Sequence, residues 1–409
     1  MADDATSGSS LVSTFMADDH SNTMPSETDQ KQNARQLSSL CWLAGIMPSP
    51  GRPGENRVTR NLPLLTGDHG ETMGRIHEKS SRFDRKGVMY PLNPLGDAGP
   101  VETASYRFAL AEVQLWRRHL EEEGYVVLAG ALTLEEVQRG KDLLWSDLES
   151  VHHISRDHPE TWNKWRLSIT GLDTSVVQDA GAWFVRSCPG VKKAFEEFWG
   201  SSDLIVSMDA QIFWRPWWIR SAWKPQTEPL HLDQNPFHKP NLETIQGMVP
   251  LLPVTKTTGG LQVVPRTHTA SAKDALKEER PHLAYRGDWC PLMTAHQDSI
   301  LLLASPGDLL LWDSRTIHGG LVGSGRAVAA SAACPAAEAE LARMAVTVAM
   351  VPRSRASEEV LRKRLEGFQK GLCFNHSPHE AGTSTGTLSS SHAKRHDFEQ
   401  LTPEQRALL

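Results

Sequence analysis

The chain has 409 residues and a formal net charge of −6, with 43 lysines and arginines against 49 aspartates and glutamates. This length is enough to bury one large core or two modest ones. No cluster of basic residues resembles a surface that neutralises a row of phosphates, so nucleic acid is not an expected partner.

Five widely spaced cysteines without a C-x-x-C pair argue against a disulfide framework and against a thiolate zinc site. No apolar run approaches the roughly 18 residues of a membrane span. The opening stretch, MADDATSGSS, is acidic where a targeting peptide would need positive charge. We therefore expect a cytoplasmic protein that does not associate with membranes.

Residues 1–104 are rich in Ser, Asp, Gly, Asn and Pro and show no sustained periodicity, which predicts a largely disordered N-terminal extension. Order is expected from residue 105. Apolar residues at helical spacing predict a first helix, and they are Leu110, Val113, Trp116 and Leu120. Gly124 is expected to end this helix, and YVVLAG after it predicts a short strand.

A second helix is expected to begin at Thr133, because Thr133 and Glu136 form the T-x-x-E pattern of a capping box. Its expected buried face consists of Leu134, Val137, Leu144, Leu148 and Val151. Two helices would thus precede the region of strands.

From Leu204 onward, short apolar runs alternate with Pro and Gly turns, as is typical of an antiparallel barrel or jelly roll. The runs are LIVSMDAQIFW, QGMVPLL, GGLQVV, SILLLA, DLLLWDSRTIH and RMAVTVAMV. A last helix is predicted with Ser357 as its N-cap and with Leu361, Leu365 and Phe368 on one face. Residues 381–409 are expected to form a polar C-terminal tail.

The stretch HLDQNP contains a candidate metal-binding pair, because His231 and Asp233 would point to the same side of an extended strand. The same pattern occurs at His69/Glu71, His158/Glu160 and His296/Asp298, so spacing alone does not choose among them. A third ligand is offered by His318 at the end of PGDLLLWDSRTIHGG. In a jelly roll, the strands that carry the paired ligands and the distal histidine are neighbours in space but far apart in sequence. Several strand candidates lie between His231 and His318, whereas only one lies between His296 and His318.

Two histidines and one carboxylate on one face leave the opposite coordination positions open. This arrangement suits non-haem Fe(II) that takes up O2 and a co-substrate, and zinc hydrolysis is the alternative. The other histidines, His376 among them, are interpreted as surface or packing residues.

From about Ala182 to about His379 the sequence resembles the phytanoyl-CoA dioxygenase-like family of Fe(II)/2-oxoglutarate-dependent oxygenases. The motifs that carry the resemblance are HLDQNP, IQGMVPLL, GGLQVVPRTH, PGDLLLWDSRTIHGG and GFQKGLCFNHSPH, in this order. The resemblance implies a mainly β fold with flanking helices (α+β), with a double-stranded β-helix (jelly-roll, cupin-like) core in a dioxygenase domain over residues 105–380.

The resemblance also implies that His231, Asp233 and His318 bind Fe(II), with 2-oxoglutarate and O2 as co-substrates. The implied activity is hydroxylation of a C–H bond in a small organic or lipid-like substrate, with release of succinate and CO2. Halogenation is disfavoured, because related halogenases lack the carboxylate that Asp233 provides. The alternative function is a jelly-roll protein that binds a metal or ligand without turnover, and the oligomeric state is undetermined.

A 2-oxoglutarate-dependent enzyme needs a cation for the distal carboxylate of this co-substrate, and arginine can bind it through two parallel hydrogen bonds. Arg343 is favoured, because a period of two places it with Ala345, Thr347 and Ala349 on one strand face. Arg326 is the alternative. Gln246 and Thr316 are further candidates for contact with 2-oxoglutarate, although a buried glutamine can equally serve backbone groups.

Overall fold

The computed structural model describes residues 103–104, 106–227, 229–292, 298–326, 340–380, 382 and 395–409, which belong to one compact unit. The predicted N-terminal extension lies outside these residues, except for Thr103 and Ala104. His69 and His296 of the other histidine-x-acid pairs also lie outside them.

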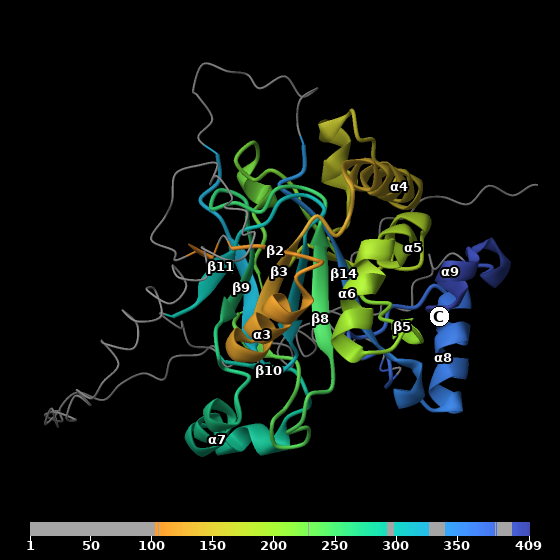
Figure 1. The fold of residues 1–409 in the computed structure, drawn as a ribbon. Helices are drawn as coiled ribbons and strands as arrows, with labels where there is room; N and C mark the ends of the chain where they lie inside the picture. The colour runs from red at the N-terminus through yellow and green to blue at the C-terminus, as the bar shows by residue number, and fades with distance from the viewer. Residues whose placement is uncertain are drawn as a thin grey trace, which may run out of the picture. The chain divides into compact units, whose positions relative to one another are not determined.

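Two sheets form the core of the fold (Figure 1), and eight of their strands make up its two layers. One layer has the order β12-β8-β14-β6 within a larger sheet, and the other has the order β11-β9-β13-β7 within a smaller one. The first four are β6 (Gln211–Trp214), β8 (Ile245–Pro250), β12 (Leu309–Asp313) and β14 (Arg343–Pro352). The other four are β7 (His231–Leu232), β9 (Gly259–Val264), β11 (Ile300–Leu302) and β13 (Ile317–Val322).

All pairings within these two layers are antiparallel, and the chain passes repeatedly from one layer to the other. This topology confirms the double-stranded β-helix, built here from two open sheets rather than a closed barrel. Short strands extend the sheets, namely β1 (Thr103–Ala104), β2 (Phe108–Ala109), β3 (Tyr125–Ala129), β4 (Leu172–Asp173), β5 (Leu204–Val206) and β10 (Cys290–Pro291).

Successive side chains of β14 point alternately toward the helices and toward the space between the two sheets. Met344, Val346, Val348 and Met350 belong to the cluster that includes the helices, whereas Ala345 packs in the cluster between the two sheets. The period-two prediction for this strand is therefore confirmed.

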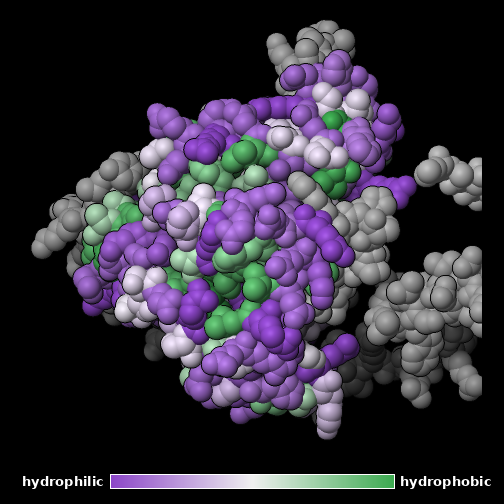
Figure 2. Space-filling view, turned by 90° about the vertical axis from the view of Figure 1, so that its right-hand side faces the viewer, coloured by the Kyte–Doolittle hydropathy of each residue, from purple (hydrophilic) through white to green (hydrophobic). Residues whose placement is uncertain are grey.

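Five helices gather on one side of the sheets (Figure 1). They are α4 (Leu134–His152), α5 (Ala180–Ser187), α6 (Pro189–Trp199), α8 (Glu358–Gln369) and α9 (Pro403–Arg406). Helices α5 and α6 pack directly on β14. Figure 2 shows this side of the molecule, where hydrophilic residues predominate and hydrophobic ones gather in the middle of the face.

The predicted end of the first helix at Gly124 and the start of the second at Thr133 are confirmed, whereas Leu110, predicted on the first helix, precedes it in a turn. Helix α3 (Val113–Glu123) ends at Gly124, whose φ of 84° favours glycine. Thr133 and Glu136 form both hydrogen bonds of the capping box of α4. Leu134, however, is 79% exposed, because the first turn of α4 lies at the surface and the buried face begins at Val137.

The prediction of only two helices before the strands is wrong, because α5 and α6 precede β5 as well. Pro189 is the first residue of α6, a position where its missing N–H costs nothing. A further helix, α7 (Ala270–Glu279), follows β9. In α8 the predicted N-cap Ser357 is confirmed, but Leu365 is 37% exposed and Arg364 is buried instead.

The expected polar tail is wrong for residues 395–409, which pack against the domain. Leu408 is fully buried, and its carbonyl oxygen accepts a hydrogen bond from the backbone N–H of Val206 in β5. The buried guanidinium of Arg364 donates to the carbonyl oxygens of Leu408, Leu409 and Val206. Long-range hydrogen bonds therefore hold a segment whose composition alone indicates a tail.

No helix within the described parts of the chain combines the length and the hydropathy that crossing a bilayer requires.

Candidate metal centre and cofactor cavity

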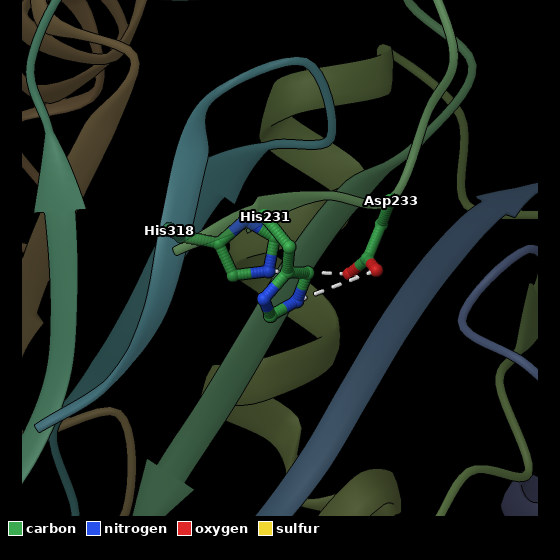
Figure 3. Close-up of side chains that lie close together, drawn as sticks. All are labelled: His231, Asp233 and His318. Atoms are coloured by element: carbon green, nitrogen blue, oxygen red, sulfur yellow. Dashed lines mark ion pairs between the residues drawn. The ribbon is translucent and has the colours of Figure 1, made fainter. Parts of the chain in front are cut away.

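His231 and His318 are direct cross-strand partners in the smaller sheet, one on β7 and one on β13. Their ring centroids lie 4.5 Å apart. Asp233 follows β7 and faces both rings, with Oδ1 at 3.5 Å from Nε2 of His231 and Oδ2 at 3.1 Å from Nε2 of His318 (Figure 3). One candidate ligand atom from each residue lies within 4.8 Å of the others, so the cluster could hold a metal ion.

Backbone carbonyls orient both imidazole rings toward this centre. Nδ1 of His231 lies 2.7 Å from the carbonyl oxygen of Pro229, and Nδ1 of His318 lies 2.9 Å from that of Thr316. A carbonyl oxygen only accepts, so each Nδ1 carries a proton, and Nε2 is the ring atom that faces Asp233 and could bind a metal. Such hydrogen bonds fix the tautomer and the orientation of metal-binding histidines.

Asp233 is held as a carboxylate. Burial by itself would raise its pKa, but His376, His231 and His318 together keep the pKa well below its usual range. The side-chain amide of Gln246 donates to Oδ2 of Asp233 at 3.0 Å. Gln246, predicted to contact 2-oxoglutarate, thus lies against a candidate metal ligand and also lines the cavity.

A cavity of about 510 Å³ is lined both by Arg343 and by the candidate metal ligands His231, Asp233 and His318, called the metal cluster below. The guanidinium of Arg343 is buried, lies over the Trp214 ring at 4.5 Å and contacts Sδ of Met248 at 3.0 Å. Within the described residues its Nε has no hydrogen-bond acceptor. Burial lowers the pKa of Arg343 to about 9, as expected for a cation that lacks an anionic partner.

Arg326, the alternative anchor, lies elsewhere. It is exposed, stacks on Trp218 at 5.3 Å and is not among the residues that line the cavity.

The structure does not support Thr316 as a cavity residue. Its hydroxyl is buried and donates to the carbonyl oxygen of Gly124 at 2.9 Å. Thr316 precedes β13, so the alternation that would place it beside His318 has not yet begun. Its role near the site is the backbone carbonyl that orients His318.

Among the cavity residues that were not predicted from the sequence, two are ionisable and lie close to Asp233 or to each other. His376, interpreted as a surface or packing residue, lies 3.7 Å from Asp233 and 3.9 Å from Asp209, and both His376 and Asp209 line the cavity. They come from irregular segments far apart in the chain, so no spacing rule links them to the metal cluster. Another histidine-x-acid pair, His158 and Glu160, forms an exposed ion pair of 3.1 Å.

A double-stranded β-helix whose interior brings together two histidines, a carboxylate and a buried arginine has the architecture of the Fe(II)/2-oxoglutarate-dependent oxygenases. Comparison with protein families gives a closer assignment. Residues 120–322 match the family model described as phytanoyl-CoA dioxygenase (PhyH), so this part of the chain is a domain of that family. The protein is therefore a 2-oxoglutarate-dependent oxygenase that uses iron and 2-oxoglutarate.

Known proteins with similarity to the chain include Ava biosynthesis cluster protein O of Aspergillus versicolor. It is 24% identical over 294 residues, which cover 64% of this chain and 86% of that protein. Among solved structures, the α-ketoglutarate-dependent epimerase SnoN is 16% identical, with 59% of this chain and 82% of that chain covered and a TM-score of 0.38. The carbocyclase SnoK is 16% identical, with 58% and 83% covered and a TM-score of 0.37.

Proposed function

We propose that His231, Asp233 and His318 bind Fe(II) and that Arg343 binds the distal carboxylate of 2-oxoglutarate. We further propose that the enzyme hydroxylates a C–H bond of a small organic or lipid-like substrate, with release of succinate and CO2. The catalytic domain would comprise residues 105–380 together with residues 395–409 that pack on it. The cytoplasmic location and the absence of a nucleic-acid partner stay predictions from the sequence.

The observation that carries this proposal is the buried guanidinium of Arg343, which has no acidic partner among the described residues and lines the same cavity as His231, Asp233 and His318. A buried cation without a partner is costly, and a carboxylate ligand would offset that cost. Strand β8 shows how far apart the metal site and Arg343 are. Gln246 on this strand contacts Asp233, and Met248, two residues later, contacts Arg343. Two residues along a strand span about 7 Å, a separation that a short dicarboxylate can bridge between metal and arginine.

The bound iron and 2-oxoglutarate would supply the oxidising chemistry, in which O2 is consumed. The protein's own residues bind and orient the iron and 2-oxoglutarate. The carbonyls of Pro229 and Thr316 hold the two imidazoles, and Gln246 holds Asp233. Trp312, whose ring lies 5.3 Å from that of His318, and Leu261 form apolar parts of the cavity wall that exclude water.

The test measures both binding and turnover. Purified protein with Fe(II), 2-oxoglutarate and O2 is expected to form succinate slowly without added substrate, and His231→Ala and Asp233→Ala should abolish this. Mn(II) binding, followed by electron paramagnetic resonance, should be lost in the same variants. His158→Ala serves as the control, because His158 belongs to an exposed histidine-x-acid pair.

Succinate formation that persists in His231→Ala would contradict the metal assignment. Metal and 2-oxoglutarate binding without succinate formation under any condition would favour the alternative, a jelly-roll protein that binds ligands without turnover.

A further inference from the structure

The part of the cavity near His376 contains a carboxylate that the proposed iron and 2-oxoglutarate sites do not use. Asp209 lies between β5 and β6, lines the cavity, and has a side chain that is 22% exposed. Its Oδ1 accepts a hydrogen bond from the backbone N–H of Ala210 at 2.7 Å. The nearest ion-pair partner of Oδ2 in the described structure is Nδ1 of His376 at 3.9 Å, too far for a hydrogen bond.

The backbone of Asp209 is held in place independently of its carboxylate. The buried guanidinium of Arg186 donates to the carbonyl oxygens of Asp209, Val177 and Thr347. These hydrogen bonds fix the backbone of Asp209. The Arg186 guanidinium makes no direct ion pair with the Asp209 carboxylate in the described structure, but its charge partly offsets the rise that burial causes in the pKa of that carboxyl. The carboxylate is thus pre-oriented toward the cavity, which favours ligand binding because little ordering remains.

The charges along the cavity wall are unevenly distributed. Among the described residues, Arg343 is the single lysine or arginine that lines it, whereas Asp209, Asp233 and Asp288 all do. With iron and 2-oxoglutarate bound, their opposite charges cancel, and so do those of Asp233 and Arg343.

Of the two remaining acids, Asp288 forms an ion pair with Lys239 at 2.6 Å, and Lys239 also pairs with Glu380. Asp209 is left as the acid without a lysine or arginine ion pair among the described residues. Burial raises the pKa of Asp209, although the charges of His376 and Arg186 act to lower it, and a cation beside it would favour its ionised form. Trp289 also lines the cavity, is 51% exposed, and lies 6.2 Å from the His231 ring, so it offers an aromatic surface to a flat or cationic group.

We propose that the substrate carries a basic nitrogen, such as an amine or a guanidine, which Asp209 binds beside the metal cluster. A carboxylate, a phosphate or the anionic part of a CoA thioester would meet Asp209, and no lysine or arginine other than Arg343 lines the cavity among the described residues to receive it. This inference rests on the proposed function, because it presupposes the iron site of His231, Asp233 and His318.

The experiment uses the full-length protein loaded with Mn(II) and 2-oxoglutarate, with loading confirmed by electron paramagnetic resonance. Two probe pairs are added, butylamine with butyrate and tryptamine with indole-3-propionate, and the paramagnetic broadening of their proton resonances is measured. Protein-dependent broadening is expected for the amines and not for the acids. Asp209→Asn should weaken amine binding by about tenfold or more, as the loss of a charge-assisted hydrogen bond predicts.

Asp288→Asn is the matched control, because it removes the same charge from the same cavity at a carboxylate already paired with Lys239. It should weaken amine binding much less than Asp209→Asn. Both variants should unfold at the midpoint of the wild type and load Mn(II), since asparagine keeps the acceptor for the Ala210 N–H.

Failure of the wild type to load Mn(II) would overturn the proposed function. Normal loading with equal broadening of amines and acids, or with none for either amine, would overturn only the present inference. Equal losses in Asp209→Asn and Asp288→Asn would overturn the assignment to Asp209.

Discussion

Replacement of Arg343 by methionine tests the cofactor site, because it is expected to change stability and ligand binding in opposite directions. The guanidinium is 5% exposed and lacks an acidic partner in the described structure. Burial lowers its pKa from 12.5 to about 9, and at 1.36 kcal/mol per pKa unit this corresponds to roughly 5 kcal/mol of destabilisation. Because the group is charged in both folded and unfolded chains at neutral pH, this cost falls on the folded state.

Methionine removes that cost and also loses the contact with the Trp214 ring, which is worth about 2 kcal/mol when desolvated. We therefore expect Arg343→Met to stabilise the ligand-free protein by about 3 kcal/mol. Binding of 2-oxoglutarate should weaken by about two to four orders of magnitude, because loss of one partner of a buried ion pair costs roughly 3–5 kcal/mol.

The assay is thermal unfolding with Mn(II), in the presence and absence of 2-oxoglutarate, for the wild type, Arg343→Met and Arg326→Met. The wild-type midpoint should rise with 2-oxoglutarate, as follows for any ligand that binds only the folded state. Arg343→Met should start from a higher midpoint and show no further rise. Arg326→Met should behave as the wild type, since Arg326 is exposed outside the cavity. A 2-oxoglutarate response that survives in Arg343→Met and disappears in Arg326→Met would refute the reasoning.

Four further variants test the fold. Gly124→Ala should destabilise by about 2 kcal/mol or more in urea unfolding, because φ is 84° and the added Cβ would lie 2.5 Å from Nδ1 of His268; an unchanged midpoint would contradict this. Burial lowers the pKa of Lys273 from 10.5 to about 7, so the unfolded chain binds one more proton across that pH window. Stability should therefore contain a component that rises from about pH 7 to 10, and Lys273→Met should remove that component; a pH profile identical to the wild type would argue against it. Leu134→Ala should change the free energy of unfolding by less than about 0.5 kcal/mol, since Leu134 is 79% exposed, and Leu144→Ala should lower it by about 2–5 kcal/mol, since Leu144 is fully buried. Equal effects of the two substitutions would contradict the claim that burial determines the loss of stability.

Several features of this protein could be predicted because local chemistry determines them. The alternation of RMAVTVAMV predicts which residues of β14 face the helices, and the structure places Met344 and Val346 there. The helix boundaries at Gly124 and Thr133 follow from left-handed backbone and side-chain capping, which depend on residues adjacent in sequence. Two residues of the metal cluster, His231 and Asp233, are likewise local, because they share one short extended segment.

The predictions that were wrong concern residues whose environment comes from distant parts of the chain. Residues 395–409 have the composition of a tail, yet Arg364 binds the carbonyl oxygens of Leu408 and Leu409. Leu365 has helical spacing with Phe368, yet the neighbouring elements bury Arg364 in its place. Helical periodicity states which residues share a face, but what packs against that face is decided by the tertiary fold.

The sequence by itself determined the strands, the helix caps and the metal-binding motif with its candidate third ligand, because each depends on periodicity or on residues close together in the chain. Only the tertiary structure distinguished Arg343 from Arg326, placed Gln246 against Asp233, and brought Asp209 and His376 into the cavity. These contacts join segments separated by many residues. Their geometry depends on strand register and on side-chain packing between the two sheets, and no spacing rule within one segment encodes either.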